Sequence, residues 1–203
     1  MKRRIIFYGD SNTYGFDPRD MWGGRYDKEF IWTNILSKNT DYEAINRGEN
    51  GREIPHTSSQ YNWLDRMLIR EGSFDLFAVM LGTNDLLIML NANEDKITAR
   101  MEEFLRFVSE HPSVKGKADI LLISPIEVKL SGYQDADRFN RVSQDLGKSY
   151  KALAEKLNIH FADASEWGIG IAYDGVHFSE EGHVKFAQEM EKTLNMLFKD
   201  REI

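Results

Sequence analysis

Short apolar runs alternate along the chain with longer stretches in which apolar residues recur at helical spacing. Runs such as Leu76–Leu81 are apolar on consecutive residues, which is typical of strands covered by helices on both faces. The pattern predicts β-strands at Arg4–Tyr8, Tyr42–Asn46, Leu76–Leu81, Ile120–Ser124 and Ile159–Ala162.

The stretches between these runs have the three- and four-residue apolar spacing of amphipathic helices. In the last stretch, Ser179 stands at the N-cap position, and the two glutamates after it suit the positive end of a helix dipole. We expect helices at Phe30–Ser37, Ser58–Arg70, Glu94–Glu110, Asp137–Leu157 and Glu180–Phe198.

Strands that alternate with helices in this way indicate an α/β fold, with a parallel five-stranded sheet between two helical layers. No repeat and no Pro/Gly/Ser-rich linker divides the chain, which has 4 prolines among 203 residues. We therefore expect a single domain over residues 1–203. In such folds, ligands bind outside the carboxyl ends of the strands.

Four polar clusters follow predicted strands and are therefore expected to converge at that edge. After the first strand comes Gly9–Gly15, after the second Arg47–Arg52, and after the third Gly82–Asp85. After the fifth, past a Gly-rich loop, comes Asp174–Ser179.

The residue types in these clusters suit hydrolysis by nucleophilic attack. A serine hydroxyl is a weak nucleophile that needs an adjacent base, and an aspartate can orient a histidine for that role. We predict Ser11 as nucleophile, His177 as base and Asp174 as the orienting carboxylate. Taken singly, Ser11 could instead cap a helix, and His177 could be an exposed loop residue.

An oxyanion formed by this attack needs preorganised hydrogen-bond donors. The N–H groups of Gly51 and Ser11 and the side-chain amide of Asn84 are the candidates. The structural alternatives are a plain turn at Asn50-Gly51 and a helix cap at Asn84. Asp10 and Asp85 are expected to support the site through local hydrogen bonds, and the chemistry needs neither a metal nor a cofactor.

Composition narrows the function further. The absence of cysteine excludes disulfide scaffolds, thiolate metal sites and a cysteine nucleophile. A net charge of −7 disfavours a nucleic-acid binder. The apolar run after the basic N-terminus stops at Gly9, too early for a signal peptide, and no run is long enough to span a membrane. We expect a cytoplasmic protein.

The ordered set of Gly-Asp-Ser, a glycine in the second block, Gly-Thr-Asn-Asp and Asp-x-x-His resembles the SGNH hydrolases, also called the GDSL lipase/acylhydrolase family. The resemblance runs from Gly9 to His177. It implies a flavodoxin-like sandwich, ester or thioester hydrolysis, and the roles given above for Ser11, Asn84, Asp174 and His177. The second block varies most in the family, so Gly48 rivals Gly51 as the oxyanion glycine.

The substrate is the least determined feature. The long loop after the first strand and the end of the fourth strand are expected to wall a pocket, with the candidates Tyr14, Phe16, Trp22, Ile126 and Tyr133. We expect a small-molecule ester with a short acyl group such as acetyl. Thioesterase and lysophospholipase activities are alternatives, and a Mg²⁺-dependent receiver-like phosphate switch built on Asp10 and Asp85 is an alternative of another class. Whether the chain forms a homo-oligomer is left open.

Overall fold

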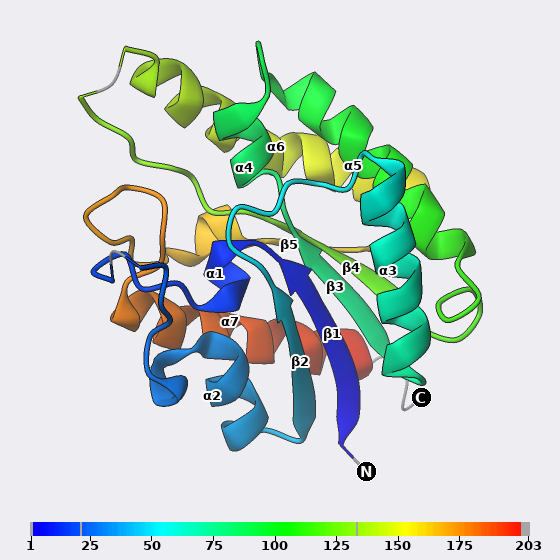
Figure 1. Cartoon of the computed structure of the whole chain (residues 1–203). Helices are drawn as coiled ribbons and strands as arrows, with labels where there is room; N and C mark the ends of the chain where they lie inside the picture. The colour runs from blue at the N-terminus through cyan, green and yellow to red at the C-terminus, as the bar shows by residue number, and fades with distance from the viewer. Residues whose placement is uncertain (1, 21, 133, 200–203) are drawn as a thin grey trace.

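A five-stranded sheet lies at the centre of the computed structural model, which describes residues 2–20, 22–132 and 134–199 (Figure 1). Its order is β2-β1-β3-β4-β5, and all four pairings are parallel. The predicted strands are confirmed, with ends that shift by one or two residues. Their bounds are β1 (Arg3–Gly9), β2 (Tyr42–Gly48), β3 (Leu76–Met80), β4 (Asp119–Ser124) and β5 (His160–Asp163).

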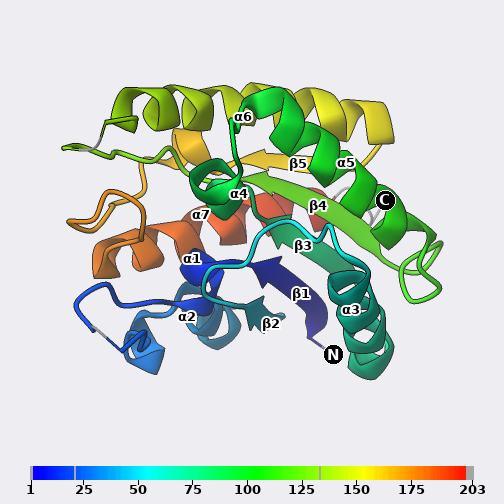
Figure 2. The same cartoon turned by 45° about the horizontal axis from the view of Figure 1, so that its top comes forward.

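Helices cover both faces of this sheet, so the molecule has three layers (Figure 2). One face carries α3 (Ser58–Glu71), α5 (Glu94–Glu110) and α6 (Ala136–Leu157). The other carries α2 (Trp32–Asn39) and α7 (Glu180–Lys199). The α/β sandwich expected from the sequence is therefore confirmed, and its strand order is the flavodoxin-like one.

Successive residues of each central strand enter different cores, which explains why the strands are apolar without interruption. In β1, Ile5 and Phe7 pack in the core under α2 and α7, whereas Ile6 and Tyr8 pack in the core under α3, α5 and α6. Strand side chains alternate between the two faces of the sheet, and here helices bury both faces.

The apolar pattern does not show two short helices that begin at the strand ends. Helix α1 (Ser11–Tyr14) starts directly after β1, and α4 (Thr83–Ile88) starts just after β3. Each is shorter than two helical turns, about seven residues, over which apolar spacing would repeat. The helix predicted from Phe30 begins instead at Trp32, because residues Lys28–Phe30 form a 3₁₀ turn and Ile31 is extended. A second 3₁₀ turn covers Ala164–Trp167.

Candidate active site

Hydrogen bonds link all four polar clusters at the carboxyl edge of the sheet. Ser11 after β1 contacts His177 after β5, at 2.9 Å between Oγ and Nε2. Arg52 after β2 donates from Nη1 to the carbonyl of Gly9 at 2.9 Å. Asn84, in α4, donates from Nδ2 to the Arg52 carbonyl at 3.0 Å. The convergence expected from the strand ends is therefore present.

Ser11, His177 and Asp174 form a continuous chain of contacts. The second ring nitrogen of His177, Nδ1, lies 2.5 Å from Oδ2 of Asp174. The other oxygen of Asp174 accepts the backbone N–H groups of Val176 and His177, each at 3.0 Å. Burial raises the pKa of Asp174, but hydrogen bonds from the His177 ring and from these amides outweigh it and lower the pKa to about 2. Asp174 is therefore ionised at neutral pH.

The Gly-Asp-Ser sequence sets the sharp turn from β1 into α1. Asp10 is the N-cap, and its Oδ1 accepts the N–H of Asn12 at 3.0 Å. Ser11 is thus the first residue of the helix and does not cap it, so its N–H has no partner within the helix. A side chain at Gly9 would place a Cβ 2.1 Å from Oγ1 of Thr13, so the turn requires glycine there. Burial raises the pKa of Asp10 to about 6.

The two rival glycines of the second cluster differ in what their N–H groups contact. The N–H of Gly48 donates to Oδ1 of Asn46 at 2.9 Å. Gly51 is exposed, has a φ of 71° and lines a cavity of about 400 Å³. Within the part of the chain that the structure describes, no acceptor bonds its N–H. These contacts favour Gly51 as a donor.

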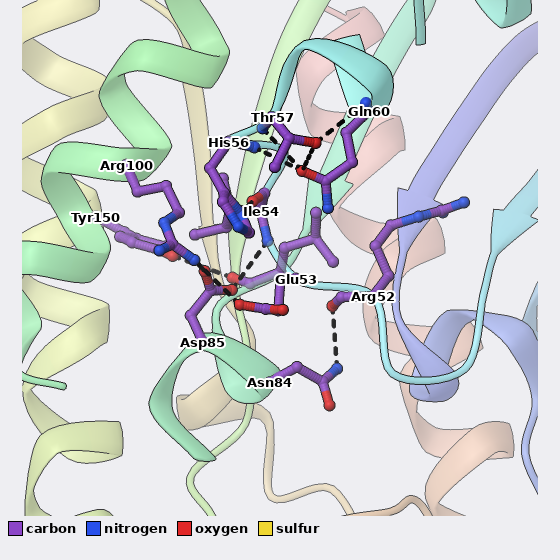
Figure 3. A network of polar contacts seen from close by, with 11 residues as sticks. Arg52, Glu53, Ile54, His56, Thr57, Gln60, Asn84, Asp85, Arg100 and Tyr150 are labelled. Atoms are coloured by element: carbon purple, nitrogen blue, oxygen red, sulfur yellow. Dashed lines mark hydrogen bonds and ion pairs between the residues drawn. The ribbon is translucent and has the colours of Figure 1, made fainter. Parts of the chain in front are cut away.

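Asn84 and Asp85 hold the segment that follows this turn (Figure 3). Asn84 uses one of its two amide N–H groups on the Arg52 carbonyl, which leaves the other available. Asp85 is fully buried; its Oδ2 accepts the Ile54 N–H at 2.9 Å, and its Oδ1 lies 2.7 Å from Nη1 of Arg100. Burial raises the pKa of Asp85 despite these partners. Asn84 lies inside α4 and is not its cap.

Arg52 has a structural role that its sequence position does not reveal. Its side chain is 8% exposed, and its guanidinium group lies over the ring of Tyr8, 4.2 Å from the ring centroid. It also donates to the carbonyl oxygens of Gly9 and Arg47 and pairs with Glu49. Arg52 therefore fastens the Gly51 turn to the ends of β1 and β2.

Two of the predicted pocket residues lie close together in sequence: Tyr14 is the last residue of α1, and Phe16 is on the loop after it. The ring centroid of Phe16 is 4.4 Å from that of His177, so Phe16 borders the candidate site. Tyr14 is half-buried, and the guanidinium of Arg25 covers its ring at 3.7 Å from the centroid. Within the described residues, the Tyr14 side chain makes no hydrogen bond or ring contact with Ser11 or His177.

The other three pocket candidates are Trp22, Ile126 and Tyr133. Trp22 is 93% exposed. Ile126 is 5% exposed and belongs to the core under α2 and α7. A pocket-wall role stays a prediction for both residues. Tyr133 lies outside the described residues.

Residues 2–20, 22–132 and 134–199 contain no helix that is long and apolar enough to cross a membrane. In the same residues, no three His, Asp or Glu side chains are grouped so that they could hold a metal ion.

Comparison with known proteins places the chain in a family. The model of the GDSL-like lipase/acylhydrolase family matches residues 7–185, whereas no curated protein matches the sequence. Among solved structures, the inhibitor-bound aryl esterase of M. smegmatis is 22% identical, with a TM-score of 0.85 over 96% of this chain and 99% of that one. Est24, a carbohydrate acetylesterase from Sinorhizobium meliloti, is 24% identical, with a TM-score of 0.82 over 97% and 100% of the two chains.

At 22% and 24% identity, the solved structures show only that the fold is shared. The match to the family model identifies the type of reaction. A Mg²⁺-dependent phosphate switch would depend on Asp10 and Asp85. In the structure, the Asp10 carboxylate caps α1, and the Asp85 carboxylate pairs with Arg100. The chain belongs to the GDSL-like lipase/acylhydrolase family and is an ester-hydrolysing enzyme of the esterase/acylhydrolase type.

Proposed function

We propose that the protein is a serine esterase that removes a small acyl group, chiefly acetyl, from an alcohol through an acyl-enzyme on Ser11. The observation that carries this proposal is the unbroken chain from Ser11 Oγ through the His177 ring to the Asp174 carboxylate, with separations of 2.9 and 2.5 Å. In this arrangement one group can attack, one can take its proton, and one can hold the ring.

The steps follow from the contacts. Ser11 Oγ attacks the ester carbonyl carbon while its proton passes to Nε2 of His177, and the ionised Asp174 stabilises the imidazolium that forms. The carbonyl oxygen becomes an oxyanion that accepts hydrogen bonds from the N–H groups of Ser11 and Gly51 and from the free amide N–H of Asn84. His177 returns the proton to the departing alkoxide. Water then attacks the acyl-enzyme by the same route, which releases the acid and restores Ser11.

A small acyl group is supported by the confined surroundings of Ser11. Ser11 is 7% exposed, and Phe16 packs against the ring of His177 beside it. We infer that this enclosure leaves little room beside the nucleophile for a long acyl chain. A structure of the same fold is described as a carbohydrate acetylesterase, which agrees with an acetyl ester as substrate.

A series of p-nitrophenyl esters of increasing acyl length tests both parts of the proposal. We expect kcat/KM to be highest for the acetate and to fall as the chain lengthens, and Ser11→Ala to abolish turnover without unfolding the protein. Acetylated sugars and acyl-CoA thioesters are measured alongside. A preference for long-chain esters or thioesters would contradict the acyl-group assignment, and undiminished turnover by Ser11→Ala would contradict the nucleophile.

A further inference from the structure

The side chain of Asn12 joins helix α1 to the loop that carries His177. Its Nδ2 donates to the carbonyl of Val176 at 3.2 Å, and its Oδ1 accepts the N–H of Phe178 at 2.8 Å. These two backbone groups flank His177 on either side. Asn12 is 4% exposed and Phe178 is fully buried, so water does not readily replace these bonds.

Asn12 is itself held in place from two directions. Its N–H donates to the Asp10 carboxylate at 3.0 Å, and its carbonyl accepts the indole N–H of Trp32 at 3.0 Å. Trp32 is buried and packs edge-on against Phe7 of β1, with ring centroids 4.7 Å apart. Asn12 therefore connects the His177 loop to a rigid part of the sheet and its helical cover.

The candidate site needs such a connection because its parts come from opposite ends of the chain. Asp174 lies in the same loop as His177, so it fixes the ring within the loop but not the loop relative to Ser11. The loop is also tied to the Lys129 N–H through Gly175, at 2.7 Å. Of the α1 side chains, all of which are described, Ser11 and Asn12 alone hydrogen-bond to residues 174–178.

We propose that Asn12 is a positioning residue that sets the separation between Ser11 Oγ and His177 Nε2. This inference rests on the proposed roles of Ser11 and His177. Asn12 follows the nucleophile in sequence, and its side chain bonds the residues on both sides of the base. It therefore links the position of Ser11 to that of His177. A displacement of the base by about 1 Å lowers the rate by roughly 100-fold in comparable cases.

Replacement by leucine tests the proposal, since leucine has a similar size but neither donates nor accepts. We expect Asn12→Leu to lower kcat for p-nitrophenyl acetate by roughly 100-fold, with KM changed by less than about threefold. Asn12→Asp keeps an acceptor for the Phe178 N–H but loses the donor to Val176, so its kcat should lie in between. Asn195→Leu is the control, because its bond to Tyr42 lies at the opposite end of the sheet.

The same substitution in a His177→Ala background separates positioning from general damage to the fold. If Asn12 acts through His177, Asn12→Leu lowers the residual rate of His177→Ala by less than about twofold. An equal loss in both backgrounds, or a wild-type kcat for Asn12→Leu, would overturn the proposal. Should Asn12→Leu fail to fold, a wild-type kcat for Asn12→Asp would overturn it equally.

Failure of this inference can be told apart from failure of the proposed function. Inactive Ser11→Ala together with fully active Asn12→Leu would remove only the role of Asn12. Fully active Ser11→Ala would remove the nucleophile, and the positioning role with it.

Discussion

Replacing Asp10 by asparagine removes an ionisable group from an enclosed position at the start of α1. Asp10 is 2% exposed, and burial raises the pKa of its carboxyl from 3.8 to about 6. The folded protein therefore holds this proton more tightly than the unfolded chain does. The resulting stability is fully present below the unfolded pKa of 3.8 and is lost as the pH rises through about 6.

The magnitude follows from the two pKa values. A change from 3.8 to about 6 corresponds to about 3 kcal/mol in the free energy of unfolding at neutral pH. Asparagine caps helices as well as aspartate does, so the variant keeps the acceptor for the Asn12 N–H. We expect Asp10→Asn to equal the wild type below about pH 4 and to exceed it by about 3 kcal/mol near pH 7.5. In a chain of this length, that is a Tm roughly 6–12 °C higher.

Urea unfolding followed by tryptophan fluorescence at both pH values measures this difference. Only a difference in unfolding free energy that changes with pH reports the ionisation of Asp10, since a constant difference would report packing or helix capping. A variant that is no more stable than the wild type near pH 7.5 would refute it. That result would mean that the helix N-terminus and Arg52 stabilise the ionised carboxylate by more than burial disfavours it.

Three further predictions have defined outcomes. Asp174→Asn should leave the fold intact but lower kcat for p-nitrophenyl acetate by about 10⁴-fold, as loss of the orienting carboxylate does in serine proteases; a loss below tenfold would contradict its role. Gly48→Ala would place a Cβ 2.1 Å from the Tyr14 nitrogen and should unfold at much lower urea than Gly51→Ala, whose Cβ meets nothing within 4 Å and whose positive φ costs about 1–2 kcal/mol. Equal midpoints for the two variants would contradict the close approach of β2 and α1. Arg100→Met leaves Asp85 buried without its ion-pair partner and should destabilise the protein by about 3–5 kcal/mol near pH 7, and by less in acid, where Asp85 is protonated; unchanged stability in urea would contradict the importance of that pair.

The sequence predicts the elements that are long enough for their apolar spacing to repeat. The apolar runs of β1 and β3 identify strands, because helices cover both faces of the sheet and bury residues 5–9 of β1 and all of β3. Helices α1 and α4 are not visible in the sequence, since four and six residues are fewer than the two turns, about seven residues, over which helical spacing repeats. The carboxyl ends of parallel strands share one edge of the sheet, and this rule predicts that Ser11 and His177 lie close together.

Other parts of the site depend on contacts that no local pattern records. The sequence predicts a pocket wall at both Trp22 and Ile126, whereas tertiary packing exposes the first and buries the second. The sequence does not show that Arg52 lies over Tyr8 and donates to backbone carbonyl oxygens. Asn12 bonds backbone atoms 164 and 166 residues away, so neither its spacing nor its residue type indicates its role.

The central claim is that Ser11 carries the acyl group during turnover. Rapid acid quenching during hydrolysis of p-nitrophenyl acetate, followed by mass spectrometry of the digested protein, tests it most directly. The account predicts one acetyl group on the peptide that contains Ser11, in wild type and not in Ser11→Ala. Acetylation of another residue that turns over at the catalytic rate, or turnover that persists in Ser11→Ala, would contradict it.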